Sequence, residues 1–108
     1  MSKRPSYLEG NVRSWGLKAD SYAGHADLAW NSDQPYWGIW GIPEADVGLL
    51  PSDMAGLRCI ELGCGTAYVS AWMHRRGAEV VAIDPTPEQL DTARRMQAIH
   101  GLDFAIEQ

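Results

Sequence analysis

The chain has 108 residues, of which 45% are hydrophobic and 21% charged, and its formal net charge is −5. This composition is typical of one small globular domain with a modest core, and it excludes a largely disordered chain. The acidic balance argues against a broad nucleic-acid surface, because such a surface needs a basic face.

The sequence shows no targeting or membrane-spanning segment. The N-terminal stretch MSKRPSYLEG lacks the apolar run of a signal peptide, and the longest apolar stretches are too short to cross a bilayer. Cys59 and Cys64 do not have CxxC spacing and no histidine cluster accompanies them, so we expect reduced thiols and no metal site. We therefore expect a cytoplasmic protein that binds neither nucleic acid nor membrane, with no signal for its oligomeric state.

Residues 1–55 are expected to form a helical and aromatic extension. Apolar residues recur at three- and four-residue steps, which predicts an amphipathic helix from about Asn11 to Trp30. The stretch NSDQPYWGIWGIPEADVGLLPSD then predicts an aromatic loop followed by a short helix. Pro43 suits the first position of that helix, and Glu44 suits the positive end of its dipole.

Residues 56–108 are expected to form the first part of a Rossmann-like, doubly wound α/β sheet. The pattern predicts strands at Leu57–Leu62, 79–84 and 103–108, alternating with helices at Thr66–Arg76 and Pro87–His100. The mostly apolar first strand is typical of a strand covered on both faces. The order β-α-β-α-β predicts parallel strands joined by right-handed crossovers.

Local signals mark the ends of the two helices. Gly77 and Gly101 stand where left-handed caps are wanted. Pro87 suits the first position of the second helix, and Thr86 with Gln89 has the spacing of a capping box.

The segment IELGCGTAYVS, residues 60–70, places a glycine-rich turn between the first of these strands and its helix. Gly63 and Gly65 let the backbone turn tightly and let a ligand approach the main chain. The helix behind them directs its free N–H groups and positive dipole end at the same place. Asp84 lies about 20 residues beyond Gly65, where an acid commonly binds a ribose diol. With Glu61, these residues favour a nucleotide site over an ordinary βα turn that carries an exposed acid.

Two nucleotide cofactors remain open at this point, NAD and S-adenosylmethionine. A dinucleotide fold prefers Gly or Ala three residues after the second glycine, and this chain has the bulky Tyr68 there. Glu61 would repel a pyrophosphate, whereas it would attract the ammonium group of a methionine. The residues therefore favour S-adenosylmethionine.

The stretches IELGCGTA and VVAIDPTPEQL resemble the first two signatures of class I S-adenosylmethionine-dependent methyltransferases, particularly the group called type 11. The resemblance covers roughly Arg58 to Gln97. It implies that Gly63 and Gly65 pass beneath the cofactor, that Glu61 faces its methionine end, and that Asp84 binds the ribose hydroxyls. The expected cofactor-binding residues are Glu61, Gly63, Cys64, Gly65, Asp84, Pro85, Gln89 and Tyr22.

The resembled family has a sheet of seven strands, so we expect this chain to be the N-terminal part of a methyltransferase acting on a small-molecule acceptor. No catalytic residue can be named, because the strands that commonly carry acceptor contacts would lie beyond Gln108. The alternatives are an NAD-dependent oxidoreductase and a non-catalytic cofactor-binding fragment. The sequence identifies no particular methyl acceptor.

Several side chains have two interpretations. The aromatic residues of the extension either form a lid over the cofactor or fill the core, and the pattern favours the core. They are Tyr22, Trp30, Tyr36, Trp37 and Trp40. His25, like the other histidines, is expected at the surface, and Cys64 is expected to be a small loop residue and no nucleophile. Asp84, at the end of a strand, is expected to pack little.

Overall fold

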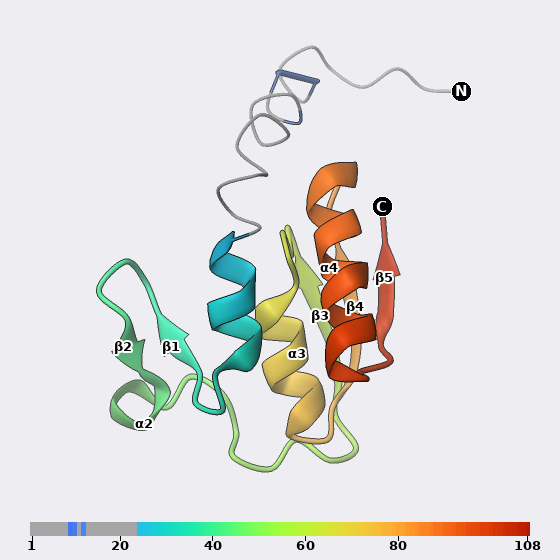
Figure 1. Ribbon diagram of the computed structural model, residues 1–108. Coiled ribbons are helices and arrows are strands. Elements are labelled where there is room, and N and C mark those ends of the chain that lie inside the picture. The colour runs from blue at the N-terminus through green and yellow to red at the C-terminus, as the bar shows by residue number, and fades with distance from the viewer. Residues whose placement is uncertain (1–8, 11, 13–23) are drawn as a thin grey trace.

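The computed structural model describes residues 9–10, 12 and 24–108 (Figure 1). A helix spans residues 24–31, within the range that the apolar periodicity predicts. Ala26, Ala29 and Trp30 are among its buried side chains. Tyr22 lies outside the described residues.

The aromatic segment forms a hairpin, where the sequence predicts a loop. Strand β1 (Tyr36–Trp37) pairs antiparallel with β2 (Ile42–Pro43). The turn between them contains Gly38 and Gly41, whose φ angles of +71° and +59° favour glycine. Each strand has only two residues, which is too short for an alternating pattern to show in the sequence.

Helix α2 (Glu44–Val47) follows the hairpin directly. Pro43 is its N-cap in an extended conformation, so the prediction of a proline at the first helical position is wrong by one residue. The Glu44 carboxylate is buried, accepts hydrogen bonds from the backbone N–H groups of Leu49 and Leu50, and lies 3.3 Å from the guanidinium Nη1 of Arg76. This contact joins the extension to the end of the next helix.

Residues 58–107 contain a three-stranded sheet and its two connecting helices. In chain order the elements are β3 (Arg58–Leu62), α3 (Tyr68–Arg75), β4 (Glu79–Ile83), α4 (Pro87–His100) and β5 (Ala105–Glu107). The strand order is β3-β4-β5, and both pairings are parallel. The predicted β-α-β-α-β order with parallel strands is confirmed, and the carboxyl ends of the strands share one edge of the sheet.

Both connecting helices pack on the same face of this sheet (Figure 1). Val80 and Ala82 of β4 face the helices and are buried, whereas Ile60 and Leu62 of β3 are 64% and 77% exposed. The expectation that the first strand is covered on both faces is therefore wrong for the described residues. The physical reason is that two successive right-handed crossovers running in one direction place both helices on one side.

The helix ends combine correct and incorrect predictions. Gly101 is the left-handed C-cap of α4, as predicted, and Gly77 takes a φ of +101° just after α3. Helix α3 begins at Tyr68, two residues later than predicted, because Ala67 is left-handed with a φ of +66°. The predicted capping box does not form, since the Thr86 side chain makes no cap hydrogen bond.

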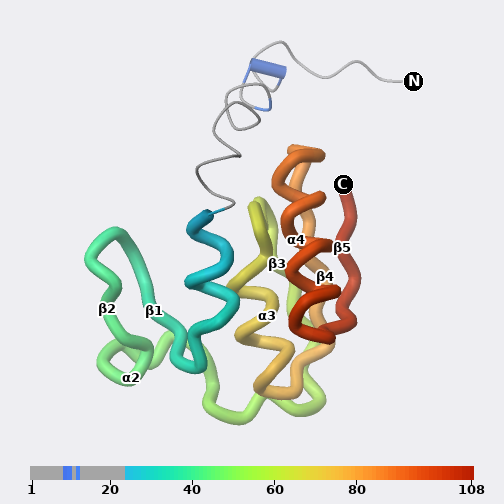
Figure 2. The backbone as a smooth tube through the Cα atoms, in the orientation of Figure 1, coloured from blue at the N-terminus to red at the C-terminus, as the bar shows by residue number. Residues whose placement is uncertain are grey.

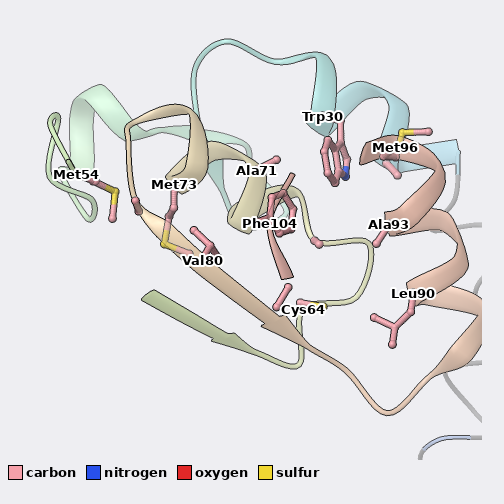
Figure 3. Close-up of a cluster of buried hydrophobic side chains, with 14 residues drawn as sticks. Trp30, Met54, Cys64, Ala71, Met73, Val80, Leu90, Ala93, Met96 and Phe104 are labelled. Atoms are coloured by element: carbon pink, nitrogen blue, oxygen red, sulfur yellow. The ribbon is translucent and has the colours of Figure 1, made fainter. Parts of the chain in front are cut away.

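One core joins the extension to the sheet. Figure 3 shows Trp30 and Met54 in one cluster with Val80 of the sheet, Leu90 of α4 and Phe104, which directly precedes β5. The tube view shows how the chain leaves the helix at 24–31, forms the hairpin and α2, and returns past α3 to β3 (Figure 2). The extension therefore packs directly beside the loop that follows β3.

Candidate functional site

The loop between β3 and α3 spans residues 63–67 at the carboxyl edge of the sheet. Gly63 and Gly65 have φ angles of +67° and +57°, a conformation that is costly for other residues. A Cβ atom at either position would meet nothing within 4 Å. The glycines are thus required by the path of the backbone, and open space remains above the main chain where a ligand can approach.

Asp84 connects this loop to the end of β4. One carboxylate oxygen, Oδ2, accepts a hydrogen bond from the Gly65 N–H at 2.9 Å. The other, Oδ1, accepts one from the Thr86 N–H at 2.8 Å. The residue is only 8% exposed. The expectation that Asp84 packs little is therefore wrong, because its carboxylate holds two backbone segments in place.

Glu61 lies on β3 and faces α3. Its Oε1 accepts hydrogen bonds from the backbone N–H of Ser70 at 3.0 Å and from the Ser70 hydroxyl at 2.6 Å. Burial is the main cause that raises the pKa of Glu61; the bonds from Ser70 act against it, and the nearby charge of Asp84 adds to it. A positive group beside this carboxylate would favour its charged form.

Cys64 turns its side chain into the core, so only its backbone remains to face a ligand. Burial, with the charges of Glu61 and Asp84, raises the pKa of the Cys64 thiol to about 12. The thiol is protonated at neutral pH, which agrees with the expectation that it is no nucleophile.

Two further predicted residues flank the start of α4. Pro85 is exposed, and its carbonyl oxygen accepts a hydrogen bond from the Gln108 side chain at 3.4 Å. Gln89 is 4% exposed, and its side-chain Oε1 has no hydrogen-bond partner among the described residues. An unpaired buried acceptor is uncommon in proteins and is consistent with a ligand donor.

The aromatic residues do not act as one group. Trp30 is fully buried in the core and donates a hydrogen bond from Nε1 to the Thr66 carbonyl at 2.8 Å. Its role as a lid is therefore excluded. Tyr36 and Trp37 pack against Trp72 with ring centroids 5.4 and 5.7 Å apart, whereas Trp40 is exposed.

Sequence reasoning missed a cleft beside the loop. It is lined by His25, Tyr36, Gly38, Ile39, Thr66 and Tyr68. These residues come from three separate segments, and no spacing in the sequence indicates that they meet. His25 is exposed, as the sequence suggested, and it also borders this cleft.

The residues at the loop fit an S-adenosylmethionine molecule. The uncrowded glycines leave room for it, the unpaired Gln89 Oε1 can accept a hydrogen bond, and two carboxylates suit a cofactor that carries positive charge. Across residues 9–10, 12 and 24–108, no group of three or more His, Cys, Asp or Glu side chains could hold a metal ion. None of the described helices is long and apolar enough to cross a membrane.

Comparison with known proteins agrees with this geometry. Residues 59–108 match the family model described as "Methyltransferase domain". This match, with the relatives described below, supports a class I S-adenosylmethionine-dependent methyltransferase, and the chain corresponds to the N-terminal part of those relatives.

Among those relatives is a protein named ubiquinone biosynthesis O-methyltransferase from Xanthomonas oryzae pv. oryzae, which is 32% identical over 99% of this chain and 43% of that protein. A protein of the same name from Xanthomonas campestris pv. campestris is 28% identical over the same shares. The magnesium-protoporphyrin O-methyltransferase of Rhodobacter capsulatus is 44% identical over 42% of this chain and 20% of that protein. The chain thus spans less than half the length of the curated relatives that it matches.

Proposed function

We propose that the protein transfers a methyl group from S-adenosylmethionine to a small-molecule acceptor. The observation that carries this proposal is the Asp84 carboxylate bound to the Gly65 N–H across the carboxyl edge of the sheet. Ligands of doubly wound sheets bind at this edge. The carboxylate and the glycine loop together offer an acid and an open backbone to one nucleoside.

The roles proposed for the individual residues follow from their positions. Each carboxylate oxygen of Asp84 retains a second acceptor site, which suits the two neighbouring hydroxyls of a ribose. Glu61 suits the methionine ammonium, and the Gly63 and Gly65 backbones would lie beneath the cofactor. The side chain of Gln89 offers its unpaired acceptor. The cofactor supplies a methyl group activated by a positively charged sulfur, and the chain's residues bind and orient it.

The acceptor atom is proposed to be oxygen. The relatives described above are named O-methyltransferases, and the one from Xanthomonas oryzae aligns with 99% of this chain. We also propose the cytoplasmic location that the sequence led us to expect, because both cysteines are free thiols.

NAD is the less favoured cofactor. Glu61 lies beside the loop where a dinucleotide would place its pyrophosphate, and two like charges at that spot repel each other. A non-catalytic cofactor-binding fragment is the other alternative, and methyl transfer by the full-length protein would exclude it.

Calorimetric titration of the full-length protein tests the proposal. S-adenosylhomocysteine should bind far more tightly than NAD, and Asp84→Asn should weaken that binding by roughly tenfold or more, equivalent to about 1.4 kcal/mol. Asp91→Asn is the control, because Asp91 is an exposed acid on α4 whose nearest ion pair with Arg94 measures 4.0 Å. Tight NAD binding, or equal affinities in the Asp84 and Asp91 variants, would contradict the proposal.

A further inference from the structure

The cleft beside the glycine loop is separate from the proposed cofactor residues. Its volume is about 300 Å³, at the lower end of the range of small-molecule sites. None of the predicted cofactor residues that the structure describes lines it, but Thr66 directly follows Gly65. The cleft therefore adjoins the glycine loop, but its described lining differs from the residues proposed to bind the cofactor.

Two aromatic side chains that line the cleft are fixed by packing against a third aromatic ring. The rings of Tyr36 and Tyr68 both pack on Trp72, with centroids 5.4 and 5.1 Å from its ring. Trp72 is itself buried and donates a hydrogen bond from Nε1 to the Ala29 carbonyl at 3.1 Å. Rings fixed in this way lose little side-chain entropy when they pack against a planar ligand.

The other residues that line the cleft indicate which ligand polarity it favours. Ile39 at the hairpin tip is 90% exposed, so an apolar group that covers it would be removed from water. Among the described residues, the lining includes no Lys, Arg, Asp or Glu, which disfavours a charged ligand. His25 adds one imidazole, which can exchange a hydrogen bond with a hydroxyl group.

We propose that this cleft binds the methyl acceptor, and that the acceptor is an uncharged aromatic molecule bearing a hydroxyl group. The ring lies between Tyr36 and Tyr68 and against Ile39, and the hydroxyl forms its hydrogen bond with His25. This inference rests on the proposed methyltransferase function and deepens it by naming the acceptor class. It also gives the aromatic hairpin a function in binding.

The test uses the full-length protein and two probes of similar shape, p-cresol and toluene, which differ in one hydroxyl. In NMR spectra, p-cresol should shift the ring signals of His25 saturably and leave those of His74 and His100 unchanged. His25→Ala should reduce the p-cresol affinity at least fivefold, to that of toluene, and leave toluene binding as it is. Retained toluene binding shows that the variant is folded.

A second pair of variants tests the hairpin wall. Ile39→Ser should weaken both probes severalfold, whereas Ile42→Ser, on the same hairpin but outside the cleft, should not. Absence of a saturable shift at His25, or equal losses in the two isoleucine variants, would overturn the proposal.

Titration of S-adenosylhomocysteine into the same samples separates the two proposals. Its affinity should be unchanged by His25→Ala and by bound p-cresol. Displacement of p-cresol by S-adenosylhomocysteine would overturn the acceptor assignment, because the cleft would then be part of the cofactor site. Binding of p-cresol with no binding of S-adenosylhomocysteine would overturn the methyltransferase function and with it the acceptor role.

Discussion

Asp84 should contribute to folding even when no cofactor is bound. In Asp84→Ala, the N–H groups of Gly65 and Thr86 lose acceptors that lie at 2.9 and 2.8 Å. A hydrogen bond to a charged group contributes about 1.5–3 kcal/mol. We take the lower value for each bond, because removing the carboxylate also removes the cost of burying its charge. The free energy of unfolding should therefore fall by about 3 kcal/mol.

The assay is urea and thermal unfolding of the full-length protein without ligand. In a domain of roughly 150–250 residues, a loss of about 3 kcal/mol lowers the Tm by about 6–12 °C. Asp84→Asn should lose about half as much, because the amide retains one acceptor oxygen and presents an NH₂ group to the other donor.

Asp91→Ala is the matched control. This aspartate lies on the surface of α4 with its side chain 80% exposed, and its loss should change stability by less than about 0.5 kcal/mol. If Asp84→Ala destabilised the protein no more than Asp91→Ala does, the carboxylate would not hold the loop. Asp84 would then matter only for the ligand.

Three further perturbations address the same region. Burial raises the pKa of Glu61 above 4.5, so its protonated form stabilises the fold and this contribution is lost as pH rises through the raised pKa. The stability of wild type relative to Glu61→Gln should fall as pH rises above 4.5, and a constant difference in urea melts would refute this. The pKa of the buried Cys64 thiol is about 12, so in the native protein iodoacetamide at pH 8 should label it at least tenfold more slowly than it labels Cys59. In urea the two thiols should react equally fast. Equal rates in the native protein would contradict the burial of Cys64. Gly77→Ala should destabilise the protein by more than about 1–2 kcal/mol of positive-φ strain, since its Cβ would lie 3.1 Å from a backbone atom. Gly48→Ala, also at a positive φ but uncrowded, should show strain alone in thermal melts.

The elements of the sheet could be predicted because their signals are local. Pro87 and Gly101 mark the two ends of α4 through their own backbone preferences, and alternating apolar segments give the strand order. The glycine loop was equally predictable, since Gly63 and Gly65 stand between a strand and a helix and no other residue adopts their φ angles as easily.

The incorrect predictions mostly concern side chains whose partners lie far away in the sequence. Asp84 was expected to pack little because its Gly65 partner becomes apparent only when β3 and β4 lie side by side. Glu44 was assigned to a helix dipole, but Arg76, 32 residues away, contributes to holding its carboxylate. Ala67 adopts a left-handed conformation that its own side chain disfavours, and no local pattern predicts that.

The helix at residues 24–31 and the loop–helix unit after β3 are joined by reciprocal indole bonds. Trp30 donates to the Thr66 carbonyl, and Trp72 donates to the Ala29 carbonyl. If an exchanged segment lacked its tryptophan, the buried carbonyl of Thr66 or of Ala29 would lose its indole donor. Hybrids joined between residues 31 and 66 should therefore be most stable when the incoming segment carries its own tryptophan, at position 30 or at position 72.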